Sequence, residues 1–161
     1  MLNVQLSRLD RILTTLRANK AALRAAIEAT PGVCFRRLAD PAGDVATHLV
    51  VTLPNAAVAA AVASDLGTKT LSNSGWHVYS NMEHLRSRRI VSGFASSVAD
   101  YVAEPGLLPA TDALLARSIT IGIGVVDAGI GSAFGLNIRS EAVDIEKVAD
   151  RFVATVGRHV G

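Results

Sequence analysis

Apolar residues recur every three or four positions across the first 28 residues, and this spacing predicts a long amphipathic helix. The arginines fall on its other faces, and Lys20 is the only break in the apolar stripe. The stripe contains Leu2, Leu6, Leu9, Leu13, Leu16, Leu23 and Ile27. At about 1.5 Å per residue the helix is roughly 40 Å long, more than a domain of this size covers by itself. We therefore expect a partner to cover part of it, with an interface at Leu2, Leu6, Leu9, Leu13 and Leu16.

A β-hairpin is predicted after this helix. Residues 30–32 (Thr-Pro-Gly) end the helix, because proline disfavours helical geometry in the residue before it and glycine frees the turn. Residues 33–38 form a predicted strand, and residues 40–44 have the chemistry of a tight turn. Residues 46–53 are then expected to return as the antiparallel partner of the first strand.

A second helix is predicted over residues 56–66, with Asn55 as its N-cap and Gly67 at its end. Its alanine and valine content makes it thin enough to lie close on a sheet. Residues 68–71 are a predicted short third strand. From residue 72 to residue 109 the periodicity disappears, and such a long irregular segment inside a domain is usually functional or mobile.

The C-terminal third returns to regular patterns. Thr111 is the predicted cap of a short helix over residues 112–117. In residues 118–126, isoleucine and valine alternate with serine, threonine and glycine, which predicts a strand with one apolar and one bare face. Backbone or a ligand can approach such a bare face. Ser140 is the predicted cap of the last helix, whose buried face is expected to contain Ile145, Val148, Ala149, Phe152, Val153 and Val156.

The order of elements predicts an α/β (α+β) two-layer sandwich, with helices on one face of a small, mostly antiparallel sheet. A chain of 161 residues, half of them apolar, suits a single domain over residues 1–161. The net charge of +2 is too small to indicate nucleic-acid binding, and the longest apolar run, residues 56–63, is far shorter than a membrane span. Without a signal-peptide pattern, and with Cys34 as the lone cysteine, we expect a cytoplasmic protein.

Several short segments resemble a known family. They are residues 5–10 (QLSRLD), 17–20 (RANK) and 31–33 (PGV). With the element order and the capped final helix, they are similar to the C-terminal small domain of the DegT/StrS-type aminotransferases. These are pyridoxal-phosphate enzymes of fold type I that aminate keto-sugars and related cyclic ketones. Residues 76–79 (WHVY) and 83–85 (EHL) occupy the place of that family's aromatic and histidine loop. The resemblance covers nearly the whole chain, but only the small domain of the family.

The resemblance implies a split, heteromeric enzyme. In that family the large domain carries the Schiff-base lysine, the acid that pairs with the pyridine nitrogen and most phosphate contacts. Met1 falls within the helix that follows the large domain, and Lys20, Lys69 and Lys147 all lack the family's lysine context. We therefore expect a small-domain subunit of a biosynthetic aminotransferase. It would be inactive alone and would receive pyridoxal phosphate only through a large-domain partner.

The irregular segment supplies the candidate substrate-binding residues. Trp76, His77 and Tyr79 follow a glycine in a polar loop, where aromatic rings give rigid walls and histidine donates or accepts protons near neutral pH. Asn81 and His84 add hydrogen-bonding groups to the same loop. The alternative is that these side chains only pack the loop onto the domain or onto a partner.

Arginines are the candidate anion-binding residues. Arg86, Arg88 and Arg89 follow the loop closely, and the planar guanidinium suits a substrate carboxylate or phosphate. The simpler explanation of these three arginines is that they lie on a solvated surface or in a salt-bridged interface. Arg139, just before the final helix, is a second candidate for binding a substrate carboxylate.

Three other patterns are given structural interpretations. His77, Glu83 and His84 have no established zinc spacing, so no metal site is expected. Cys34 is expected to be a small buried residue. Close packing and turns explain a set of glycines better than a dinucleotide loop does. That set is Gly122, Gly124, Gly129, Gly131 and Gly135.

Three functional hypotheses remain. The first is the split aminotransferase, joined to its large-domain chain through the leucine stripe and the bare strand face. The second is a non-enzymatic binding or structural domain that forms a homodimer through the same stripe. The third is an independent small enzyme that uses residues 76–84 for proton transfer on a ketone, although that loop shows no base with an orienting partner.

Overall fold

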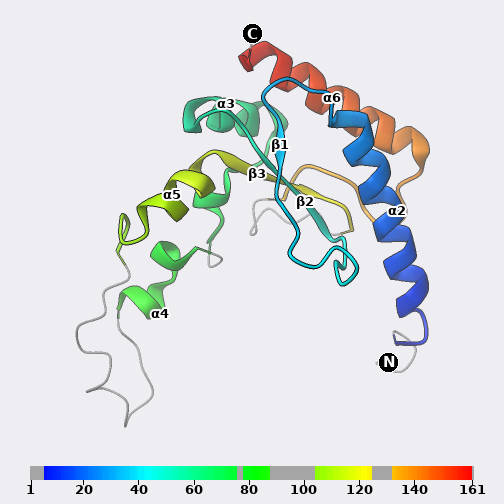
Figure 1. The fold of residues 1–161 in the computed structure, drawn as a ribbon, viewed down its shortest axis with the longest axis horizontal. Coiled ribbons are helices and arrows are strands. Elements are labelled where there is room, and N and C mark those ends of the chain that lie inside the picture. Colours follow the sequence, from blue (N-terminus) through cyan, green and yellow to red (C-terminus); the bar gives the residue numbers. More distant parts are fainter. Residues whose placement is uncertain (1–5, 76–77, 88–103, 125–131, 161) are drawn as a thin grey trace.

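The computed structural model describes residues 6–75, 78–87, 104–124 and 132–160. In these residues, helices pack on one face of a small antiparallel sheet whose strand order is β1-β2-β3 (Figure 1). The strands are β1 (Cys34–Phe35), β2 (His48–Thr52) and β3 (Ser118–Gly122). The helices that cover the sheet are α2 (Leu9–Ile27), α3 (Ala56–Leu66) and α6 (Ala142–Val160). The predicted two-layer α+β fold with a long N-terminal helix is confirmed. The predicted continuity of that helix over the first 28 residues was wrong, because a turn at residues 7–8 precedes α2, which begins at Leu9.

The two faces of the sheet differ because successive residues of a strand point to opposite sides. Leu49 pairs with Ile121 and Val51 pairs with Ile119, which places these apolar side chains on the side of the helices. They form one cluster with Leu16, Leu23, Ile27, Ala59, Val62, Leu66, Ala149, Phe152 and Val156. The other side, here called the polar face, carries Arg36, His48, Val50, Thr52, Ser118 and Thr120.

Helix α2 is covered only in its C-terminal half. Leu16 is 5% exposed at the edge of the core and Leu13 is half-buried, whereas Leu9, the first residue of α2, is 43% exposed. Leu6, which is 58% exposed, precedes α2 and is separated from it by a turn at residues 7–8. The N-terminal turns of α2 extend past α6 and past the turn of the hairpin in Figure 1. Leu2 lies outside the described residues. The apolar stripe therefore continues past the surface that this domain covers.

The predicted hairpin is confirmed, although β1 is shorter than expected. Residue pairs Cys34–Thr52 and Phe35–Val51 set the antiparallel register. In the turn at residues 40–44, Asp40 Oδ1 accepts hydrogen bonds of 3.0 Å from two backbone N–H groups, at residues 42 and 43. Such a side-chain bond to the following backbone is what makes aspartate a turn former.

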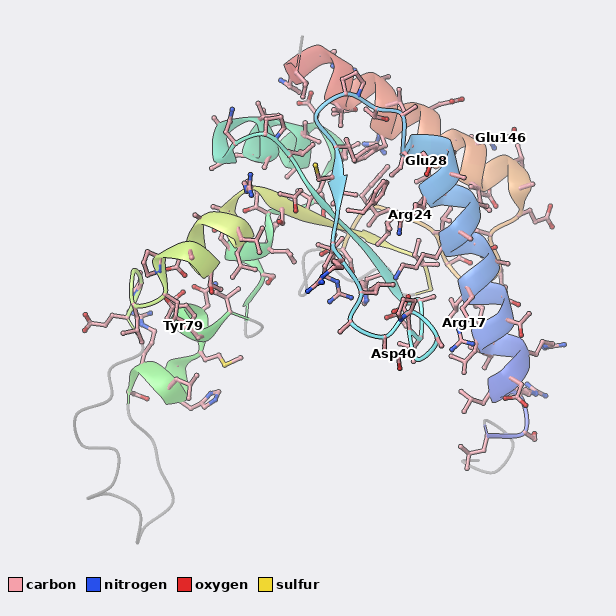
Figure 2. The ribbon with its side chains drawn as sticks, viewed as in Figure 1. Arg17, Arg24, Glu28, Asp40, Tyr79 and Glu146 are labelled. Atoms are coloured by element: carbon pink, nitrogen blue, oxygen red, sulfur yellow. The ribbon has the colours of Figure 1, made fainter. Side chains whose placement is uncertain are left out.

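Three side chains fix this turn against α2. Arg17 donates through Nε to the carbonyl of Asp44 and through a terminal nitrogen to the carbonyl of Ala42, both at 2.9 Å. The ammonium of Lys20 pairs with the Asp44 carboxylate at 2.6 Å. Figure 2 shows Arg17 on the side of α2 that faces the turn with Asp40. The RANK segment thus holds the hairpin in place on the long helix.

Helix α3 has the bounds that its local signals predict. Asn55 Oδ1 accepts a hydrogen bond of 2.9 Å from the Val58 N–H, and Gly67 takes the left-handed conformation with φ 73°. Both ends of the helix are therefore capped as predicted from the sequence.

Two elements near the sheet differ from prediction. Instead of a strand over residues 68–71, only Thr70 forms a single bridge, to Ile119, and the 3₁₀ helix η1 (Leu71–Asn73) follows at once. The cap assigned to Thr111 was wrong, because α5 (Pro109–Ala116) already begins at Pro109 with Leu108 as its N-cap. Proline fits the first helical position, which needs no N–H donor inside the helix.

Three predictions of burial or capping were also wrong. Cys34 is exposed, because it alternates with Phe35 and so points away from the core. Val153 is 38% exposed, while Thr155 is buried in its place on α6. Ser140 Oγ accepts its hydrogen bond from the Asn137 N–H, outside the helix.

Candidate functional site

The described part of the irregular segment is organised around Tyr79. Short helices η3 (Tyr79–Asn81) and α4 (Glu83–Arg86) lead toward α5, and Tyr79 lies between α4 and α5 in Figure 2. Its phenol donates to Asp112 Oδ2 at 2.8 Å and accepts from the Leu108 N–H at 3.1 Å. The same Asp112 oxygen accepts from the Gly106 N–H at 2.9 Å. Tyr79 therefore ties η3 to the start of α5.

The protonation of Tyr79 follows from these contacts. Loss of solvent around the phenol raises its pKa above the usual 10.0, and the hydrogen bond and charge of Asp112 raise it further. The N–H of Leu108 acts in the opposite direction and is outweighed. Tyr79 thus stays protonated near neutral pH, so it can donate a proton in a hydrogen bond but does not supply a base.

A cavity of about 540 Å³ lies beside this network, here called the loop pocket. Asn81 reaches it, but its amide already donates to the carbonyl of Ser72 at 2.9 Å. Apolar groups form most of the wall. The lining residues are Ser72, Val78, Ser80, Asn81, Pro105, Gly106, Pro109, Asp112, Leu115 and Ala116. A pocket of this size and composition fits a small organic molecule with few polar groups.

The other predicted loop residues lie around this pocket or outside the described part of the chain. His84 is exposed on α4 beside a second hollow, of about 380 Å³, that Asn81 and Glu83 also line. Arg86 is exposed at the end of the same short helix. Four candidates, Trp76, His77, Arg88 and Arg89, lie outside the described residues.

Arg139 is not brought to this site. It is exposed in the turn before α6, where its N–H donates to Asn137 Oδ1 at 2.8 Å. In Figure 1 this orange segment lies on the opposite side of the sheet from the green α4. Arg139 and the loop residues therefore do not converge on one ligand within this domain.

The glycines serve close packing where the structure describes them. A Cβ on Gly135, which has φ 145°, would overlap the backbone of Gly122, and one on Gly124 would overlap the side chain of Leu16. Gly129 and Gly131 lie outside the described residues. Within the described ranges, no group of three or more His, Cys, Asp or Glu residues is placed to hold a metal ion.

The lysines of this chain do not fit pyridoxal phosphate. Lys20 is engaged with Asp44 beside a cavity of only about 10 Å³, and Lys69 and Lys147 are exposed at the surface. A lysine that holds this cofactor needs an enclosed site with a counter-acid and a phosphate cradle around it. None of the three has that environment.

Asp112 is a site residue that sequence reasoning missed. It was expected only as the first residue of a short helix, yet it accepts hydrogen bonds from residues 6 and 33 positions away.

A search against models of known protein families found none that matches this chain. No helix in the described part of the chain has both the length and the apolarity to cross a membrane.

Proposed function

We propose that this chain is the small-domain subunit of a DegT/StrS-type aminotransferase, acting with a separate large-domain chain that carries the cofactor lysine. The order of elements and the segments that resemble this family support the proposal. So do the three lysines, since none of them is placed to hold pyridoxal phosphate. The substrate would be a keto-sugar or related cyclic ketone, and the lone cysteine suits work in the cytoplasm.

The unequal cover of α2 carries the proposal. Exposure along its stripe rises from 5% at Leu16 to 43% at Leu9, and Leu6, in the segment just before the helix, is 58% exposed. Full burial of a leucine side chain stabilises by about 1.5–3 kcal/mol relative to exposure, so a partner gains from covering these positions. The large-domain chain would occupy this end of α2.

Co-expression with a candidate large-domain chain tests the proposal. We expect the two chains to co-purify. The complex, unlike this chain alone, should show the absorbance of bound pyridoxal phosphate. The Leu6→Ser/Leu9→Ser double variant should weaken the complex about tenfold or more, because two buried side chains lose their apolar contacts. Val153→Ser, at an apolar position on α6 that is 38% exposed, is the matched control and should assemble normally.

A second candidate function uses the same exposed leucines. The exposed Leu9 at the start of α2, with Leu6 in the segment before it, also fits a second copy of the same surface, which would make this a non-enzymatic, self-associating domain. A stable homodimer that is disrupted by Leu6→Ser/Leu9→Ser, and that takes up neither cofactor nor a large-domain chain, would support this candidate. It would contradict the aminotransferase proposal.

A further inference from the structure

A cavity of about 340 Å³ opens on the polar face of the sheet and shares no lining residue with the loop pocket, although residues 71–74 contribute to both. Its volume lies at the lower end of the range of about 300–1,000 Å³ that is usual for small-molecule sites. Its lining includes Arg36, His48, Val50, Leu71, Ser74 and Thr120. We call this cavity the sheet-face pocket.

Strand register brings these residues together. Val50 pairs with Thr120, so both side chains point to the polar face, and His48 joins them because it lies two residues before Val50. On the other side, Phe35 faces the core, so Arg36 turns toward the polar face, and its N–H donates to the Val50 carbonyl at 3.1 Å. The residues after Thr70 cross this face and add Ser74.

The charge of the pocket favours an anion. Asp44 also lines it, and its carboxylate pairs with Lys20 at 2.6 Å and is attracted by the charge of Arg36, so two cations here face one carboxylate. The exposed guanidinium of Arg36 then adds a positive charge with a planar fork of donors. Guanidinium bonds to carboxylate or phosphate oxygens are among the stronger hydrogen bonds in proteins.

The floor of the pocket is built rather than incidental. Thr120 is 4% exposed and Ser74 is 1% exposed, so two hydroxyl-bearing side chains are held in buried positions in the pocket that Arg36 also lines. Ser74 Oγ donates to the Leu71 carbonyl at 2.7 Å, which fixes its oxygen in place. Val50 and Leu71 supply apolar contact for the body of a ligand.

We propose that the sheet-face pocket binds a small anionic metabolite, whose carboxylate or phosphate group is held by Arg36 and oriented by Thr120. His48 forms one wall, with its Nδ1 2.9 Å from Thr47 Oγ1. The proposal rests on the pocket alone and does not depend on the aminotransferase assignment.

Titration of the full-length ¹⁵N-labelled chain with inorganic phosphate and, separately, with glutarate tests this site by NMR. We expect saturable shifts at the amides of Arg36, Val50 and Thr120. Arg36→Gln should weaken binding about tenfold or more, since the anion loses its charged hydrogen-bond donors. Arg37→Gln, the neighbouring exposed arginine that does not line the pocket, is the charge-matched control and should bind normally.

Thr120→Val removes one hydroxyl at nearly constant shape and should weaken binding severalfold without unfolding the sheet. Saturation by phosphate alone would indicate a phosphorylated ligand, and saturation by glutarate alone a carboxylate. The proposal is overturned if neither probe gives saturable shifts. It is also overturned if Arg36→Gln binds like the parent chain, or if Arg37→Gln loses as much affinity as Arg36→Gln.

Discussion

Replacement of three glycines by alanine tests the packing of segment 132–137 against the sheet. Gly135 has φ 145°, a conformation that side chains rarely adopt, and an added Cβ would overlap the backbone of Gly122. Two hydrogen bonds join these segments, from Gly122 N–H to the Phe134 carbonyl at 2.9 Å and from Leu136 N–H to the Gly122 carbonyl at 2.7 Å. Gly135→Ala therefore strains the backbone and also pushes these bonds apart.

The expected magnitudes separate strain from overlap. Backbone strain of about 1–3 kcal/mol and the loss of two hydrogen bonds of about 0.5–1.5 kcal/mol each give a destabilisation by Gly135→Ala of about 2–6 kcal/mol. Gly67 also has positive φ, at 73°, but its added Cβ would meet nothing within 4 Å. Gly67→Ala should cost only the left-handed strain, about 1–2 kcal/mol.

Gly157→Ala provides a control of opposite sign. Gly157 lies inside α6, and an added Cβ there also meets nothing within 4 Å. Alanine in a helix interior should stabilise by about 0.5–1 kcal/mol relative to glycine. Urea unfolding followed by circular dichroism gives all three free energies of unfolding. The reasoning is refuted if Gly135→Ala costs no more than Gly67→Ala, or if Gly157→Ala destabilises the fold.

Two further predictions concern ionisable groups. Burial alone would raise the Asp44 pKa, but the hydrogen bond and charge of Lys20 outweigh it and hold the pKa below 3.8. The ionised carboxylate therefore stabilises the fold above pH 3.8. This stabilisation disappears as pH falls through the lowered pKa. Lys20→Met should move the Asp44 pKa upward in an NMR titration, whereas Lys147→Met should leave it unchanged. Because the pKa of Tyr79 is raised, the protonated phenol contributes to the free energy of unfolding below pH 10.0. That contribution is lost as pH rises through the higher pKa of the folded state. The Tyr79→Phe variant should therefore lack this alkaline loss of stability when unfolding is followed as a function of pH. A pH dependence identical to that of the parent chain would contradict the raised pKa of Tyr79.

Local signals predicted the parts of the fold that depend on neighbouring residues. Asn55 and Gly67 determined both ends of α3, and Asp40 determined the turn of the hairpin, because each acts on backbone within a few positions. The extent of β1 and the exposure of Cys34 depend on which partner residues lie opposite in the sheet, and so they were predicted less well.

The candidate sites show the same division. Tyr79 and Asn81 were predicted because they lie in one irregular segment, and both do reach the loop pocket or its supporting network. Asp112 was missed, as were Arg36 and His48, since strand register and the packing of α5 bring them to their sites. Arg139 was grouped with the loop residues by chemistry alone, and the fold separates them.

The outer edge of β3 limits how this protein can associate. As the last strand of the sheet, β3 would expose backbone groups on which another chain could add a strand. Thr70 bridges Ile119 near one end and Gly135 bridges Gly122 at the other, so both ends of that edge are already occupied by the chain itself. This edge therefore resists the strand-by-strand growth that leads to aggregation, which leaves the two-residue strand β1 as the other edge of the sheet.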